Sequence, residues 1–133
     1  MPTRVALLLL LAACSAPLAK PEHHADIVPA EHTEAAARNA ELVDRAKGSH
    51  APVVFLGDSI TEQWETAGKA VWNEALAPLN ALDLGVGGDR TEHLLFRLKS
   101  GAYDKLPVRV AVILIGTNNL GTGKTPEQAA DGV

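Results

Sequence analysis

Three short apolar segments, each closed by a glycine, constrain the fold of this chain more than any other feature. Their sequences are APVVFLG, ALDLG and RVAVILIG. Continuous apolar runs, rich in β-branched residues in the first and third segments, are typical of strands buried on both faces of a parallel sheet. The predicted strands cover residues 53–57, 81–85 and 109–116.

Segments with a helical pattern precede and separate these strands. The first, EHTEAAARNAELVDRAKG, is rich in strong helix formers and ends at Gly48, where a helix C-cap is expected. The predicted helices cover residues 31–47, 59–77 and 90–99. From the first strand onward the order is β-α-β-α-β, which indicates right-handed crossovers and a three-layer α/β fold around a parallel sheet.

The loops that leave the carboxyl ends of the strands are expected to form the ligand crevice. In an open parallel sheet these ends meet at one edge, and ligands bind there. The three loops have the sequences GDS, GVGGD and GTNN. They bring Ser59, Gly88 and Asn118 to one edge as candidate site residues.

Ser59 has two interpretations. It opens the segment SITE, which fits a capping box in which the serine hydroxyl and Glu62 each accept a backbone N–H. Alternatively, it is an exposed nucleophile for acyl transfer, which also needs a base and donors for the oxyanion. Taken alone, the segment favours the cap.

Gly88 and Asn118 also have structural and functional interpretations. Gly88 can serve only the turn, or its backbone N–H can approach a substrate closely because the residue lacks a side chain. Asn118 can be a turn former, or it can aim its side-chain amide into the crevice. Each signal is weak by itself.

Together, the three loops resemble the first three sequence blocks of the SGNH, or GDSL, hydrolases. The resemblance rests on GDSI at 57–60, GVGGDRTEHLLFRL at 85–98 and VILIGTNN at 112–119. Within that family, the chain is most similar to the catalytic subunits of intracellular platelet-activating-factor acetylhydrolase and their bacterial relatives. The similarity extends over residues 31–133.

This resemblance implies a flavodoxin-like α/β/α fold and a serine esterase that hydrolyses small O-acyl esters. Acetyl esters of lipid or carbohydrate are the expected substrate class. The resemblance also implies that Ser59 is the nucleophile, and that its backbone N–H, the Gly88 N–H and the Asn118 side-chain amide form the oxyanion hole. No metal or organic cofactor is implied.

The chain departs from the family pattern in one block. These hydrolases carry an Asp-x-x-His motif that supplies the base and its orienting carboxylate, and none occurs in the 133 residues. His93, inside the third predicted helix, is interpreted as a helix-surface or packing residue. Without the family's C-terminal strands and histidine loop, the third strand should have an uncovered hydrophobic edge. We therefore expect the N-terminal portion of an enzyme, with little or no esterase activity and doubtful solubility.

The N-terminal residues indicate export to a bacterial cell envelope. Arg4 precedes an apolar run, 5–13, which suits a secretory signal and is too short to span a bilayer. The run ends in LAAC, which resembles the bacterial lipobox, so we expect cleavage before Cys14 and lipid attachment there; cleavage after Ala19 is the alternative. The predicted organisation is a signal peptide at 1–19, a tether at 20–30 and a hydrolase domain at 31–133.

The charge balance argues against nucleic acid as a partner. Twelve basic and sixteen acidic residues give a net charge of -4, without the basic patch that phosphate backbones attract. Membrane contact is expected only through a lipid on Cys14. His23, His24 and His32 could bind a metal, but no cysteine or clustered carboxylate completes a ligand set, so no metal site is expected.

Two other functional classes remain as alternatives. The segment NNLGTGKT, residues 118–125, differs from a P-loop by one residue, because Asn118 stands where glycine is required. Pro126 follows directly, where a P-loop helix should already be running. TPEQAA is therefore predicted to begin a new helix with Thr125 as its cap. The other alternative is a non-catalytic envelope binding module with the same fold.

Overall fold

The computed structural model describes residues 27–133. The predicted signal peptide, the lipid attachment at Cys14 and the histidine pair His23 and His24 lie outside the described residues. Within 27–133, no helix is both long enough and apolar enough to cross a membrane.

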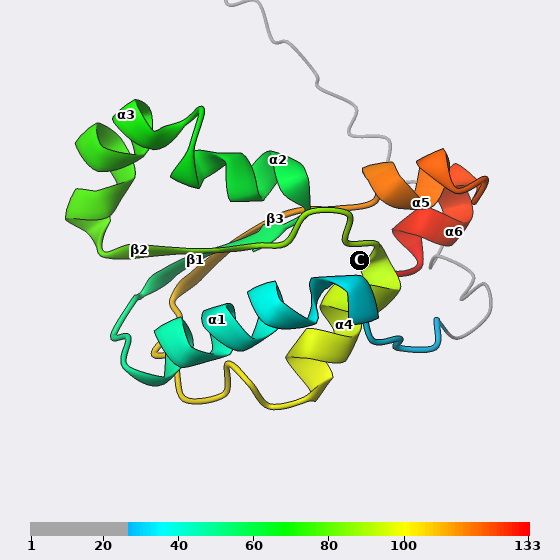
Figure 1. The fold of residues 1–133 in the computed structure, drawn as a ribbon, viewed down its shortest axis with the longest axis horizontal. Helices are drawn as coiled ribbons and strands as arrows, with labels where there is room; N and C mark the ends of the chain where they lie inside the picture. The colour runs from blue at the N-terminus through cyan, green and yellow to red at the C-terminus, as the bar shows by residue number, and fades with distance from the viewer. Residues whose placement is uncertain (1–26) are drawn as a thin grey trace, which may run out of the picture.

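A three-stranded parallel sheet forms the centre of the fold (Figure 1). Its strands are β1 (Val53–Gly57), β2 (Ala81–Gly85) and β3 (Val110–Leu114), in the spatial order β2-β1-β3. The register places Gly57 beside Gly85 on one side and beside Leu114 on the other. The three strands therefore end level with one another, which confirms the predicted strands and their common carboxyl edge.

Helices lie on both faces of the sheet. On one face are α1 (Ala36–Lys47), which is entered through the 3₁₀ turn η1 (Thr33–Ala35), and α4 (Thr91–Lys99) (Figure 1). On the other are α2 (Ser59–Glu62) and α3 (Lys69–Val71). Two short helices, α5 (Thr117–Gly121) and α6 (Pro126–Ala130), follow β3. This arrangement is part of a flavodoxin-like α/β/α fold, as predicted.

The single helix predicted over 59–77 is wrong. The segment is divided into α2, a 3₁₀ turn η2 (Gln63–Glu65), α3, a π turn η3 (Trp72–Leu76) and a 3₁₀ turn η4 (Ala77–Leu79). The physical reason is packing against β1. The rings of Trp64 and Trp72 both meet Phe55 edge-on, with centroids 6.3 and 5.3 Å from it, and the backbone bends between the two indoles to allow both contacts.

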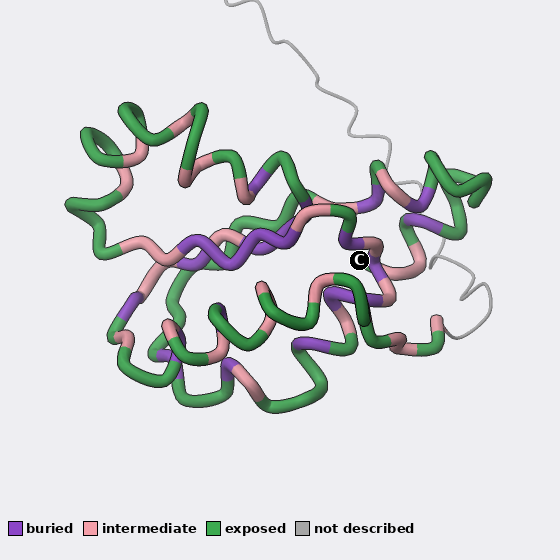
Figure 2. Tube along the Cα trace, in the orientation of Figure 1, coloured by how far each residue is buried: buried purple, intermediate pink, exposed green. Residues whose placement is uncertain are grey.

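The hydrophobic core lies between the sheet and the layer formed by α1 and α4 (Figure 2). Val54 and Leu56 alternate with Phe55 along β1, so they point to the opposite face from the two indoles. The core cluster consists of Leu42, Ala46, Val54, Leu56, Leu84, Val86, Leu94, Tyr103 and Leu106. This core fixes the orientation of β1 and β2, whose ends carry two of the three candidate loops.

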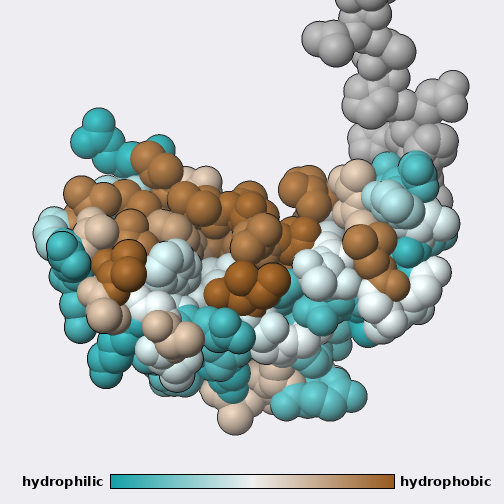
Figure 3. All heavy atoms as spheres, turned by 90° about the horizontal axis from the view of Figure 1, so that it is seen from above, coloured by the Kyte–Doolittle hydropathy of each residue, from teal (hydrophilic) through white to brown (hydrophobic). Residues whose placement is uncertain are grey.

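β3 forms one edge of the described sheet and is exposed along its whole length. Its residues Val110, Val112, Ile113 and Leu114 are each between 41% and 51% exposed. Figure 3 views the molecule from the side on which α2 and α3 lie, and it shows apolar atoms gathered over that side of the molecule. The uncovered hydrophobic edge predicted for the third strand is thus present, and such an edge favours self-association.

Candidate active site

Ser59 is the first residue of α2 and lies where β1 meets that helix. It is exposed, and its hydroxyl has no hydrogen-bond partner among the described residues. The helix cap is Asp58, whose backbone is extended and whose Oδ1 accepts the Ile60 N–H at 2.9 Å. The capping box expected for Ser59 and Glu62 is therefore wrong: the aspartate one residue earlier caps the helix and leaves the serine hydroxyl free.

Glu62 instead connects α2 to the loop after β2. Its Oε2 accepts the Gly87 N–H at 2.5 Å. The helix can sit this close because Gly85 has no side chain: a Cβ at that position would overlap the backbone of Glu62. A Cβ at Gly87 would lie 3.9 Å from the Cβ of Ser59, so the second loop passes directly beside the serine.

Gly88 occupies a tight turn in that loop. The Asp89 N–H donates to the Val86 carbonyl at 3.1 Å, and Gly88 has a φ of 77°, a conformation that favours glycine. Gly88 is exposed, and its own N–H makes no hydrogen bond within residues 27–133. The turn thus presents an unengaged backbone donor near Ser59, as the candidate role requires.

Asn118, the second residue of α5, joins the first two loops. Its Nδ2 donates to the Asp89 backbone carbonyl at 2.8 Å and lies 3.5 Å from Asp58 Oδ2. Asp89 follows Gly88, and Asp58 precedes Ser59. The structure therefore brings the three candidate residues to one edge of the sheet, although in this state the Asn118 amide faces two protein oxygens.

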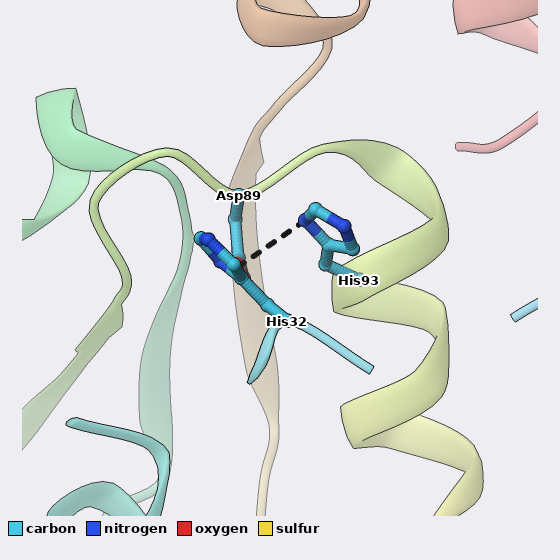
Figure 4. A group of neighbouring side chains, drawn as sticks. All are labelled: His32, Asp89 and His93. Carbon is cyan, nitrogen blue, oxygen red and sulfur yellow. Dashed lines mark hydrogen bonds and ion pairs between the residues drawn. The ribbon is translucent and has the colours of Figure 1, made fainter. Parts of the chain in front are cut away.

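Asp89 is the centre of a buried ionic cluster that sequence spacing did not reveal (Figure 4). The residue is fully buried, and its Oδ1 accepts a hydrogen bond from His32 Nδ1 at 2.8 Å. Its Oδ2 accepts from Arg97 Nη2 at 2.5 Å, and Arg97 is itself 5% exposed. His93 lies across the same carboxylate, with its Nδ1 3.8 Å from Oδ1.

His32, Asp89 and His93 are close enough to be considered as metal ligands. The expectation that no carboxylate accompanies His32 is thus wrong, because the fold brings Asp89 to it. The two imidazole rings, however, are stacked, with centroids 4.5 Å apart and planes 19° apart. Nitrogen lone pairs lie in the ring planes, and lone pairs in two stacked, nearly parallel planes do not meet at one ion. The Arg97 guanidinium also occupies the other carboxylate oxygen. We therefore interpret the cluster as a structural ionic network.

None of the histidines within the described residues forms a hydrogen bond with the Ser59 hydroxyl. His93 is 5% exposed and its Nδ1 accepts the Arg90 N–H at 3.1 Å. Burial, together with the neighbouring Arg90 guanidinium, lowers the pKa of His93. The interpretation of His93 as a packing residue is confirmed, but it is not on the helix surface.

Asn119 was missed by the sequence interpretation, although GTNN contains two adjacent amides. It is 2% exposed, and its Oδ1 accepts the Thr91 N–H at 2.9 Å. Its Nδ2 donates to Glu92 Oε2 at 2.9 Å. Asn119 therefore holds the first turn of α4, while its neighbour Asn118 contacts the two loops that follow β1 and β2.

The segment that resembles a P-loop does not have the required geometry. Its first residues belong to α5, whereas a phosphate-binding loop needs an open backbone before its helix. The predicted new helix is confirmed as α6: Pro126 is its first residue, and Thr125 Oγ1 accepts the Gln128 N–H at 3.2 Å.

Comparison with known proteins agrees with this geometry. The model of the GDSL-like Lipase/Acylhydrolase family matches residues 55–132, which include all three loops. The chain is 38% identical over 92 residues to the platelet-activating factor acetylhydrolase IB subunit alpha1 of Bos taurus, covering 69% of this chain and 38% of the relative. It is 36% identical over 122 residues to the alpha2 subunit of Gallus gallus, covering 90% of this chain and 49% of that protein. The chain thus spans less than half the length of these relatives.

Proposed function

The chain belongs to the GDSL-like lipase/acylhydrolase family, and on that premise we propose that it carries the nucleophile and oxyanion hole of a serine esterase. The proposed substrates are small O-acyl esters, with acetyl esters of lipid or carbohydrate as the favoured class. Both the family and the acetylhydrolase relatives support ester hydrolysis. The single observation that carries the proposal is the free, exposed hydroxyl of Ser59 beside the unengaged Gly88 N–H.

In the proposed reaction, Ser59 Oγ attacks the ester carbonyl carbon and its proton passes to a base. The carbonyl oxygen becomes an oxyanion that accepts hydrogen bonds from the backbone N–H groups of Ser59 and Gly88. The ester C–O bond then breaks, the alcohol leaves with a proton, and water hydrolyses the acyl-serine. Hydrogen-bond donors that the fold already holds in place stabilise such an oxyanion, because the protein does not have to rearrange as the negative charge develops.

Asn118 can supply the third donor and still keep the hydrogen bond that holds its side chain in place. One N–H of its amide makes the 2.8 Å hydrogen bond to the Asp89 carbonyl, which fixes the side chain. The other points toward Asp58 Oδ2 at 3.5 Å, a distance at the outer limit of hydrogen bonding. That weakly engaged N–H is the one we assign to the oxyanion.

No Asp-x-x-His motif occurs in the 133 residues, and none of the described histidines forms a hydrogen bond with Ser59. We propose that these residues alone hydrolyse esters slowly or not at all.

The experiment is to compare p-nitrophenyl acetate hydrolysis by the full-length gene product, its Ser59→Ala variant and residues 27–133 alone. Activity that requires Ser59 in the full-length protein supports the proposal. Equal activity of the full-length protein and its Ser59→Ala variant contradicts it. A folded full-length gene product that lacks activity supports the alternative of a non-catalytic binding module, whereas inactivity of residues 27–133 alone is expected under either function.

We further propose that the protein is exported and anchored in the cell envelope through Cys14, because residues 5–14 combine an apolar run with a lipobox-like end. The expected result is membrane-associated protein that becomes soluble in the Cys14→Ser variant. An unchanged distribution between membrane and soluble fractions would contradict lipid attachment.

A further inference from the structure

The segment before α1 returns to the edge of the sheet where the candidate loops meet. The Ala30 N–H donates to the Glu92 carbonyl of α4 at 3.2 Å, which fixes the segment beside that helix. Two residues later, His32 reaches Asp89, 57 positions away in the sequence, through the 2.8 Å hydrogen bond of its Nδ1. The side chain of His32 is only 14% exposed, so this contact is largely sheltered from water.

Asp89 couples this segment to two of the oxyanion donors. Its carboxylate is held by His32 on one oxygen and by Arg97 on the other, and its backbone carbonyl receives the Asn118 amide. The residue before it is Gly88. A buried carboxylate is costly unless both of its oxygens are paired. Loss of the His32 bond therefore favours movement of the backbone that carries the Gly88 N–H.

His32 also contacts the turn directly. A Cβ at Gly88 would lie 3.2 Å from His32 Cε1, so the imidazole edge packs against the turn. On its other side the ring stacks on His93, as Figure 4 shows. The imidazole thus fills the space between α4 and the turn. In that place its Nδ1 also donates the hydrogen bond to Asp89.

We propose that His32 is a positioning residue for the oxyanion hole, which holds the Gly88 N–H in place through Asp89. This inference rests on the proposed esterase function. His32 does not touch the reacting atoms. It acts by fixing the loop after β2 from a segment that precedes the first helix.

The test compares two substitutions in the full-length gene product. In His32→Asn the amide nitrogen occupies nearly the place of Nδ1, so the donor to Asp89 is kept. In His32→Leu the donor is lost while the side chain stays apolar and of moderate size. Because small misplacements of catalytic groups cost up to about 100-fold in rate, the expected kcat of the leucine variant is about 10- to 100-fold lower with KM nearly unchanged. The asparagine variant is expected to keep most of the wild-type kcat.

His50→Leu is the matched control, because His50 is exposed and its hydrogen bond within the described residues is accepted by its backbone carbonyl, not by its ring. Should the leucine variant fail to fold, His32→Gln replaces it: its amide nitrogen lies one methylene farther out, so a lowered kcat is again expected. Wild-type kcat in a folded leucine or glutamine variant would overturn the proposal. So would an equal loss of kcat in the asparagine and leucine variants.

A second readout is independent of catalysis. Amide hydrogen exchange at Asp89, whose N–H donates to the Val86 carbonyl across the Gly88 turn, should accelerate in His32→Leu and remain near the wild-type rate in His32→Asn and His50→Leu. If the wild-type protein shows no esterase activity, the proposed function fails, and this exchange pattern still decides whether His32 holds the loop. Unchanged exchange in the leucine variant would overturn the inference even in an active enzyme.

Discussion

The Asn118 amide nitrogen lies 2.8 Å from the backbone carbonyl oxygen of Asp89, and this hydrogen bond joins the loop after β3 to the loop after β2. Asn118→Ala removes both this link and the proposed third oxyanion donor. Because loss of one such donor costs about 10²- to 10³-fold in rate, kcat for p-nitrophenyl acetate should fall by that factor in the full-length protein. Asn73→Ala, at an exposed asparagine, is the control and should leave kcat unchanged. A decrease of less than threefold in Asn118→Ala would exclude the donor role.

The residues Asp58 and Ser59 should respond differently to substitution, since the first caps α2 and the second has a free hydroxyl. Asp58→Ala is expected to lower the free energy of unfolding by about 1 kcal/mol, the usual value of an N-cap. Ser59→Ala should change it by less than about 0.5 kcal/mol, as for surface positions without special contacts. Urea denaturation measures both, and a larger loss in Ser59→Ala would show that the serine has a structural role.

Asp83 should make the chain less stable as the pH rises. The residue is 4% exposed, and burial raises its pKa from 3.8 to about 6. Its Oδ1 accepts the Gly85 N–H at 2.8 Å, whereas Oδ2 has no partner within the described part of the chain. The folded protein therefore binds this proton more tightly than the unfolded chain. Its contribution to stability is complete below about pH 4 and is lost as the pH rises through about 6.

Asp83→Asn keeps an oxygen for the Gly85 N–H and removes the buried charge. The variant should be more stable than the wild type by about 1 to 3 kcal/mol at pH 7, and this difference should disappear below pH 4. Thermal unfolding at several pH values measures the effect, with Asp44→Asn, at an exposed aspartate, as the control. A variant that is less stable at pH 7 would contradict this account of a buried charge that destabilises the fold.

Glu65 should have the opposite pH dependence. Burial alone would raise its pKa, but hydrogen bonds from Arg45 and Arg38 lower it to about 2. The folded state therefore favours the carboxylate, and this stabilisation is present above about pH 4.5 and is lost as the pH falls toward 2. Because the side chain is 28% exposed, Glu65→Gln is expected to cost only about 1 kcal/mol at pH 7. The control is Glu74→Gln, at an exposed glutamate, and a Glu65→Gln variant as stable as the wild type would show that the ion pairs contribute nothing.

The sequence predicted those parts of the fold that depend on local pattern. The three strands follow from continuous apolar runs, and their parallel order follows from the alternation with helices. That order alone brought Ser59, Gly88 and Asn118 to one edge of the sheet. The strand ends then lie level, because Gly57 pairs with Gly85 and with Leu114.

Features that depend on contacts between distant residues could not be predicted. His32 and Asp89 are 57 positions apart, and no spacing rule connects them. The helix expected over 59–77 is broken because Trp64 and Trp72 both pack on Phe55, a tertiary effect that overrides helical propensity.

The assignment of the cap shows a limit of a different kind. Asp58 and Ser59 are adjacent and both residue types are good N-caps, but the sequence interpretation considered only Ser59. The extended backbone of Asp58 decides between them. This one-residue difference leaves the serine hydroxyl free.

The central claim, that Ser59 is a nucleophile, is tested most directly by reaction with a fluorophosphonate probe. The full-length gene product is labelled, digested and examined by mass spectrometry to locate the modified residue. The expected result is a stoichiometric adduct on Ser59, absent from the Ser59→Ala variant and strongly slowed in Asn118→Ala. A folded full-length protein that carries no adduct on Ser59, or that is labelled equally in the Ser59→Ala variant, would contradict the claim.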